Sequence, residues 1–233
     1  MRVLVASSGG VDSTYLLWKL ATTTADEITA VYFDSGISLS IYGELPALRN
    51  ALDWIRANVR DIPLVTKSVI YSDWRYPMVY ENCGAMMDGF DECYTGRGID
   101  NGKIGGAPNF SNSEKISYYR SLFAKGAPDK VMRSPLSEWG KARSHCISEM
   151  PADLFALTLG CYKPKIQSGV FQHKCGRCPK CLMDQYCVDA LAQGKSPDDI
   201  NDELLRLRGS GKYAADGPLD ERYVVPAYPV PSQ

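Results

Sequence analysis

A pair of glycines between an apolar strand and a helix constrains this chain more than any other feature. The loop is residues 8–13 (SGGVDS); the apolar run Val3–Ala6 precedes it and the helical segment Ser13–Leu20 follows it. Adjacent glycines let the backbone approach an anion closely and adopt dihedral angles closed to other residues. The amides that begin a helix point outward, with the positive end of the helix dipole behind them. The loop is therefore predicted to hold phosphate oxygens at the carboxyl end of a strand.

This sequence excludes two other glycine-rich phosphate loops. A Walker A loop needs Gly-Lys-Ser/Thr, which does not follow Gly10, and a dinucleotide fingerprint needs a third glycine at a fixed spacing. The plainer interpretation of the glycine pair is a tight turn without a ligand. The hydroxyls of Ser8 and Ser13 add hydrogen-bond donors, and together with the carboxylate of Asp12 they favour the phosphate interpretation.

Strand-like and helix-like segments alternate through the first two-thirds of the chain. This alternation predicts an α/β fold, with a parallel twisted sheet flanked by helices. The expected strands are residues 3–6, 28–33, 64–70, 92–95 and 131–133, and the expected helices are 13–20, 45–59, 113–124 and 141–150. Residues 71–90 show no clear period and stay unassigned. Three parts are expected: a nucleotide-binding α/β domain (1–150), a metal-binding helical module (151–210) and an extended C-terminal tail (211–233).

Four of the eight cysteines have the spacing of metal ligands. They follow the pattern C-x13-C-x2-C-x2-C, in which each C-x2-C step lets two thiolates reach one tetrahedral ion. Four sulfurs with no open position predict a structural Zn²⁺ site, with an iron–sulfur cluster or a metal-free group as alternatives. The predicted ligands are Cys161, Cys175, Cys178 and Cys181. The others are expected to be buried thiols, unless one is a sulfur-transfer nucleophile: Cys83, Cys93, Cys146 and Cys187.

The composition limits the classes of binding partner that the chain is expected to have. The net charge of −1 gives no general attraction to nucleic acid or to an anionic membrane, so neither is expected as a partner. No segment reaches the about 18 apolar residues that a membrane span needs, and the N-terminus lacks the pattern of a signal peptide. A cytoplasmic protein is therefore expected. Cysteines in that reducing compartment favour metal binding over disulfides.

Residues 8–13 resemble the PP-loop motif SGGxDS of the N-type ATP pyrophosphatases. Combined with a C-terminal cluster that ends in CGxCxxC, the loop resembles the 7-cyano-7-deazaguanine synthase family in particular. Two further segments are similar to that family: Ser134–Ala142, and Leu157–Tyr162 with its first metal ligand. The resemblance spans residues 3–36 and 130–187.

The resemblance implies an adenine nucleotide alpha hydrolase-like fold and an ATP-dependent carbon–nitrogen ligase. ATP would adenylate 7-carboxy-7-deazaguanine, ammonia would displace AMP, and a second ATP would activate the resulting amide for dehydration to the nitrile. ATP, Mg²⁺ and a structural Zn²⁺ are the implied cofactors, and a homodimer is a possible assembly. The implied catalytic residues are Asp12, Ser13 and Lys141, with Asp12 also a candidate Mg²⁺ ligand.

The remaining implied contacts follow the loop and the ends of two further strands. ATP would meet Ser7, Ser8, Gly9, Gly10, Val11, Asp12, Ser13, Phe33, Asp34, Ser35, Thr95 and Gly96, and the acceptor would meet Arg97, Asp100 and Asn101.

The middle of the chain departs from the family, because residues 71–94 lack its Pro-Gly-Arg-Asn segment. That segment helps to form the acceptor site, so other acceptors stay open. The alternatives are a PP-loop enzyme that adenylates a modified base, a protein or tRNA, including a tRNA-thiolating enzyme, and an ATP-binding module without catalysis. A tRNA-thiolating enzyme would need a reactive cysteine and a basic face.

Overall fold

The structure is a computed structural model of the 233-residue chain. It describes residues 1–34, 41–69, 77–98, 112–159, 161, 165–167, 170–173, 176 and 178–209. Four of the predicted site residues lie outside these ranges: Ser35, Asp100, Asn101 and Cys175.

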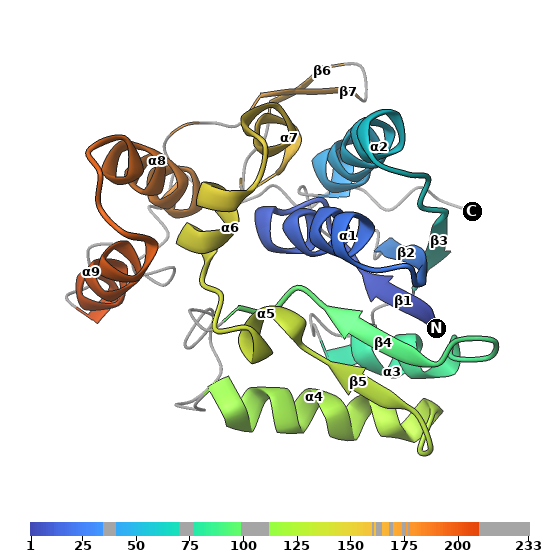
Figure 1. The fold of residues 1–233 in the computed structure, drawn as a ribbon. Coiled ribbons are helices and arrows are strands. Elements are labelled where there is room, and N and C mark those ends of the chain that lie inside the picture. The colour runs from blue at the N-terminus through green and yellow to red at the C-terminus, as the bar shows by residue number, and fades with distance from the viewer. Residues whose placement is uncertain are drawn as a thin grey trace, which may run out of the picture.

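A five-stranded parallel sheet forms the centre of the fold, with its strands in the order β3-β2-β1-β4-β5 (Figure 1). This confirms the predicted α/β class. The strands are β1 (Arg2–Ala6), β2 (Glu27–Asp34), β3 (Leu64–Ser68), β4 (Glu92–Thr95) and β5 (Val131–Arg133). A separate antiparallel pair is formed by β6 (Lys165–Gln167) and β7 (Val170–His173).

Helices cover both faces of the sheet (Figure 1). In chain order they are α1 (Val11–Thr23), α2 (Ile41–Asn58), α3 (Pro77–Ala85), α4 (Asn112–Gly126), α5 (Pro135–Glu138), α6 (Arg143–Glu149), α7 (Ala152–Leu157), α8 (Pro179–Ala192) and α9 (Pro197–Gly209). The first two cover one face, and α3 and α4 cover the other.

The core consists of one apolar layer on each side of the sheet. Along β1, Val3 and Val5 pack into the layer beneath α1 and α2, whereas Leu4 packs into the layer beneath α3 and α4. This alternation follows from the two-residue period of a strand. Because both faces are buried, β1 is apolar along its whole interior, as parallel strands are.

All five predicted strands are present, with end points that differ by at most one residue, apart from β3, which ends at Ser68, two residues before its predicted end. The segment 71–90, which showed no period, contains α3. Polar residues do not recur along α3 at a helical spacing, so its sequence shows no amphipathic pattern that would predict the helix. The short helices α5 and α7 and the β6–β7 hairpin were not predicted, since segments of three to six residues carry too few positions for a period.

The C-terminal helices join the same core. Met183 and Cys187 of α8 and Ile200 and Leu204 of α9 belong to the buried cluster that holds Val3 and the residues of α1. The division at residue 150 stays a prediction. Within the described part of the chain, no helix is both long enough and apolar enough to cross a membrane.

Candidate nucleotide site and cysteine cluster

The sheet reverses its direction of growth at β1. From β1 the chain proceeds to β2 and β3 on one side, and β4 and β5 pair on the other side. In open parallel sheets, ligands bind beyond the carboxyl ends of the strands at such a reversal point. The two segments that leave this point are the loop after β1 and the residues after β4. The topology therefore places residues 7–13 and Thr95–Gly96 at one end of the sheet.

Gly9 has a backbone conformation and surroundings that no other residue fits. Its φ angle is 69°, in the left-handed region that favours glycine. A Cβ atom on Gly9 would lie 2.7 Å from the carbonyl oxygen of Glu44 and 2.7 Å from the amide nitrogen of Leu48, both on α2. The carbonyl of Gly9 also accepts a hydrogen bond from the amide of Leu159, at 2.7 Å. Backbone contacts from two other segments therefore hold the loop.

Ser13 braces the loop from inside. Its hydroxyl donates to the carbonyl of Gly10 (3.2 Å) and accepts from the amide of Ser8 (3.3 Å). The amide of Thr14 bonds to the same Gly10 carbonyl (3.0 Å), so the helical pattern gives no intrahelical acceptor to the three preceding amides. The amides of residues 11–13 are therefore the ones suited to an anion, with the Ser13 hydroxyl shaping the turn beneath them.

Gly96, after β4, packs directly against the start of α1. A Cβ atom on Gly96 would lie 2.8 Å from both the Cα atom and the amide nitrogen of Ser13. The preceding Thr95 is buried, and its hydroxyl lies 3.1 Å from the hydroxyl of Ser134 after β5. The predicted nucleotide residues that follow β1 and β4 are therefore in contact. A side chain at position 96 would push these two segments apart.

Arg143 joins the loop to α8, a role that no pattern in the sequence indicates. Its Nη1 atom lies 3.4 Å from Asp12 Oδ2 in the loop, and its Nε atom donates to Asp184 Oδ1 at 2.6 Å. The side chains of Arg143 and Asp184 are only 9% and 6% exposed, so water screens this pair little. A lone arginine has no spacing pattern, so only the three-dimensional contact identifies it.

The predicted catalytic lysine, Lys141, forms an ion pair with Glu149 on α6. Glu149 also accepts hydrogen bonds from Tyr15 and Lys19 of α1. Burial alone would raise the pKa of Glu149, but the bonds from Lys141, Tyr15 and Lys19 outweigh it and lower this pKa to about 2. Lys141 therefore holds Glu149, the residue through which α6 contacts Tyr15 and Lys19 of α1, and the phosphate role of Lys141 stays a prediction.

The predicted ATP contacts at the end of β2 and the predicted acceptor contacts are described in part. Phe33 and Asp34 end β2, and both are half-buried. Arg97 lies one residue beyond Gly96, where its Nε donates to the hydroxyl of Tyr80 at 2.8 Å and its guanidinium lies 4.2 Å from the ring centroid of Tyr119. These aromatic contacts hold the guanidinium in place at the carboxyl end of β4.

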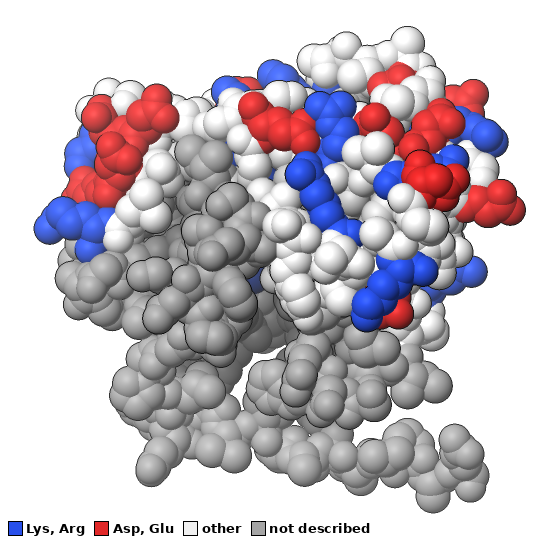
Figure 2. Space-filling view, turned by 90° about the horizontal axis from the view of Figure 1, so that it is seen from below, with Lys and Arg blue, Asp and Glu red and all other residues white. Residues whose placement is uncertain are grey.

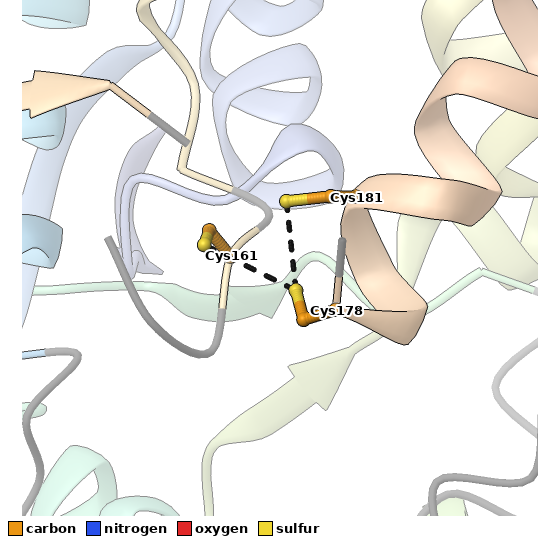
Figure 3. A group of neighbouring side chains, drawn as sticks. All are labelled: Cys161, Cys178 and Cys181. Atoms are coloured by element: carbon orange, nitrogen blue, oxygen red, sulfur yellow. Dashed lines mark hydrogen bonds between the residues drawn. The ribbon is translucent and has the colours of Figure 1, made fainter. Parts of the chain in front are cut away.

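Three of the four predicted metal ligands converge in the structure (Figure 3). The sulfur of Cys178 lies 3.5 Å from that of Cys181 and 4.0 Å from that of Cys161, and all three sulfurs lie within 4.8 Å of one another. Thiolates bound at about 2.3 Å to one tetrahedral Zn²⁺ lie about 3.8 Å apart. The sulfur positions therefore fit a tetrahedral metal ion, and Cys175, the fourth predicted ligand, lies outside the described residues.

The cysteine cluster lies next to the loop. Leu159, whose amide binds Gly9, shares a buried apolar cluster with Cys161, Cys181 and Ala47. Ala47 lies in the turn of α2 that also contacts Gly9, between Glu44 and Leu48. One turn of α2 and the residue Leu159 therefore contact both regions.

Charges of both signs are mixed on the described surface in Figure 2. Acidic residues gather at the end where α9 lies, a helix with Asp198 and Asp199 in its first turn. Elsewhere on this view, lysine and arginine are interspersed with aspartate and glutamate. The described residues on this face do not form a continuous basic surface of the kind that binds an RNA backbone.

No protein-family model matches the chain, and no curated protein matches it. Among solved structures, it is similar to the U34-tRNA thiolase NcsA from Methanococcus maripaludis with its 4Fe-4S cluster, at 13% identity over 89% of this chain and 72% of the other, with a TM-score of 0.44.

Two other solved structures are similar at a lower score. A predicted subunit of tRNA methyltransferase from Methanocaldococcus jannaschii has 14% identity over 85% of this chain and 90% of the other, with a TM-score of 0.36. A bulky-bulky ketone specific alcohol dehydrogenase from Comamonas testosteroni has 8% identity over 96% and 98% of the two chains, with a TM-score of 0.33. We therefore infer the function from the site.

Proposed function

We propose that this chain is an ATP-dependent enzyme that holds the departing pyrophosphate of ATP on residues 7–13. The observation that carries this proposal is the position of the SGGVDS loop at the reversal point of the sheet, with helix-start amides beside Asp12. The close packing of Gly9 and Gly96 supports it, because it fixes the backbone of the loop before a ligand arrives.

The proposed reaction begins with attack of a carboxylate oxygen on the α-phosphorus of ATP. The bond to the β-phosphate oxygen breaks, and pyrophosphate leaves with its charge stabilised by the amides of residues 11–13 and the helix dipole. Mg²⁺, when bound with ATP, would neutralise phosphate charge, and Asp12 supplies a carboxylate for it. In this proposal Gly96 borders the nucleotide, and Phe33 and Asp34 border the adenine.

The proposed acceptor is 7-carboxy-7-deazaguanine, after the resemblance of the two motifs. Ammonia attacks the acyl carbon of the adenylate and displaces AMP, which gives the amide. A second ATP activates the amide oxygen, whose departure leaves the nitrile. The aromatic contacts of Arg97 support a role in acceptor binding, since they hold a cation beside the loop where an anionic planar acceptor would bind.

The cysteine cluster is proposed to bind structural Zn²⁺, with Cys175 as the fourth ligand to Cys161, Cys178 and Cys181. The separations of the three described sulfurs support this assignment. Metal analysis of the purified chain tests it: about one zinc per chain is expected. A stoichiometric iron content with visible absorption would contradict it and indicate an iron–sulfur cluster.

The enzyme assay uses the full chain with ATP, Mg²⁺, ammonium and 7-carboxy-7-deazaguanine. We expect mass spectrometry to detect the nitrile, together with AMP and pyrophosphate. Omission of the deazaguanine acid is the control for uncoupled ATP cleavage, and the double variant D12A/S13A is the control for contaminating enzymes. Pyrophosphate release that requires the deazaguanine acid but yields no nitrile would keep the acceptor and contradict the ammonia steps. ATP binding without pyrophosphate release in response to this acid would contradict the acceptor only. Failure of the wild-type chain to bind ATP would refute the proposal as a whole.

Sulfur transfer to tRNA is the second candidate, and the short path between the cysteine cluster and the loop is the observation that favours it. Three sulfurs lie one buried residue, Leu159, away from Gly9. The mixed surface charge in Figure 2 is the observation against it. Incubation of the chain with ATP, a sulfide source and unmodified tRNA, followed by nucleoside analysis, decides between the candidates. A thiolated nucleoside would favour this one.

A further inference from the structure

One face of α8 is turned towards the phosphate loop. Asp184 lies on this face, since its carboxylate receives the Nε–H of Arg143 at 2.6 Å while Nη1 of the same guanidinium lies 3.4 Å from Asp12. Lys180 precedes Asp184 by four residues, so the two side chains lie on the same face of the helix, one turn apart. The helical spacing alone therefore directs Lys180 towards the loop.

The charged groups around Lys180 come from the loop and from α2, α6 and α8. Its ammonium interacts electrostatically with the carboxylates of Asp12, Glu44 and Asp184 and with the guanidinium of Arg143. Asp12 belongs to the loop itself. Glu44 lies on α2, and its backbone carbonyl oxygen is one of the atoms that a side chain on Gly9 would contact. Lys180 is half-buried. Its ammonium is therefore placed beside the loop rather than in open solvent.

Each of the three carboxylates near Lys180 also has another partner. Asp12 and Asp184 share Arg143, and Glu44 accepts the hydroxyl of Tyr32 at 3.5 Å. An ammonium group has three N–H donors, and a phosphate oxygen can share this ammonium with the carboxylates. Pyrophosphate would also bring several negative charges to a place that already holds carboxylates. Cations at the loop are required to offset them.

We propose that Lys180, which lies in the first turn of α8 between Cys178 and Cys181, is a cation of the nucleotide site that contacts phosphate. The proposal rests on the proposed function, because it concerns the same loop. Lysine is a compact point charge on a flexible stem, which suits a phosphate group. Cys178 and Cys181 flank Lys180 closely, so a metal held by both sulfurs would fix the backbone that carries it. The cluster would then serve the nucleotide site by placing a residue, without taking part in the chemistry.

Calorimetric titration of the metal-loaded full chain with magnesium pyrophosphate and with ATP tests this assignment. We expect K180M to weaken the affinity for pyrophosphate about tenfold or more, and K180R to recover part of it. The control is K195M, in the turn that follows α8, where Lys195 pairs with Glu203; it should bind pyrophosphate as the wild-type chain does. Zinc content is measured for each variant.

A second measurement uses the wild-type chain and so does not depend on how a variant folds. Acetylation of lysines by acetic anhydride is followed by mass spectrometry, with and without magnesium pyrophosphate. Protection of Lys180 but not of Lys195 supports the proposal. Equal acetylation of Lys180 in both samples, or wild-type affinity in zinc-loaded K180M, would overturn it while leaving the proposed function intact. If the wild-type chain binds neither pyrophosphate nor ATP, the proposed function fails first.

Discussion

The SGGVDS loop and the cysteine cluster both contain a glycine of positive φ, but for different physical reasons. Gly9, with φ of 69°, has no room for a side chain, because two backbone atoms of α2 lie 2.7 Å from the place of its Cβ atom. Gly176, with φ of 73°, has no atom within 4 Å of that place. The loop is shaped by close backbone packing, whereas the cysteine turn is shaped by the sulfurs that converge on one point. The loop should therefore not tolerate a side chain at Gly9, and the cysteine cluster should not tolerate the loss of one of its ligands.

The largest expected effect is loss of a cysteine ligand. C161S should abolish zinc binding and lower the free energy of unfolding by about 4 kcal/mol or more, because the free energy of metal binding contributes to folding. The measurements are zinc content and urea unfolding. The matched control is C146S, a buried cysteine outside the cluster, which should keep its zinc. Full zinc occupancy in C161S would show that the three sulfurs do not form the site.

Loss of the arginine that joins the two regions should come next. R143M removes a guanidinium from Asp12 and Asp184, and breaking a buried ion pair in this way costs about 3–5 kcal/mol. Urea unfolding measures the loss. R143K keeps the charge but not the two-sided geometry, so it should recover only part of the stability. Equal stability of R143M and wild type would mean that the loop and α8 are not coupled through this residue.

A methyl group at Gly9 should have a smaller but more local effect. G9A combines an unfavourable φ with a backbone clash, and we expect a loss of about 3 kcal/mol together with loss of pyrophosphate binding. G140A is the control: Gly140 has φ of 65° and open space around it, so only the cost of φ, about 1–2 kcal/mol, remains. Urea unfolding and calorimetry measure both variants. If G9A and G140A lose the same free energy of unfolding, backbone packing does not constrain position 9.

The smallest expected effect concerns Glu149, whose partner Lys141 was predicted to contact phosphate. Its pKa falls from 4.5 to about 2 in the folded chain, so its contribution to stability is full above pH 4.5 and is lost as the pH falls towards 2. After allowance for partial exposure this contribution is about 1 kcal/mol. E149Q should remove it, so that the difference from wild type in urea unfolding is present at pH 7 and shrinks towards pH 2.

The control for this titration is E81Q, which alters an exposed carboxylate on α3. As a change at an exposed side chain, it should alter the free energy of unfolding at pH 7 by no more than about 0.5 kcal/mol. K141M then separates the two roles of Lys141. If pyrophosphate affinity is unchanged in K141M, the lysine serves only the contact of α6 with α1; if it falls, the predicted phosphate role is supported.

Much of the fold was predictable because long elements carry a period or an apolar run. The strands at Val3–Ala6 and Ile28–Phe33 and the helix that contains Leu45 and Ile55 were found in this way. The hairpin β6–β7 and α7 were missed, since short elements form when neighbouring segments supply their partners. The three described cysteines of the cluster were predicted from spacing alone, because a ligand turn is a local structure.

By itself the sequence determined the loop, the succession of strands and helices along the chain and the spacing of the cysteines, because each depends on residues close together in the chain. Only the tertiary structure decided that the two regions are neighbours. Arg143 against Asp12 and Leu159 against Gly9 each join segments more than a hundred residues apart, and Arg143 carries the connection on to Asp184 of α8. Such contacts leave no pattern in the local sequence. They are stabilised by burial and by charge between residues far apart in the chain, and no spacing rule relates such residues.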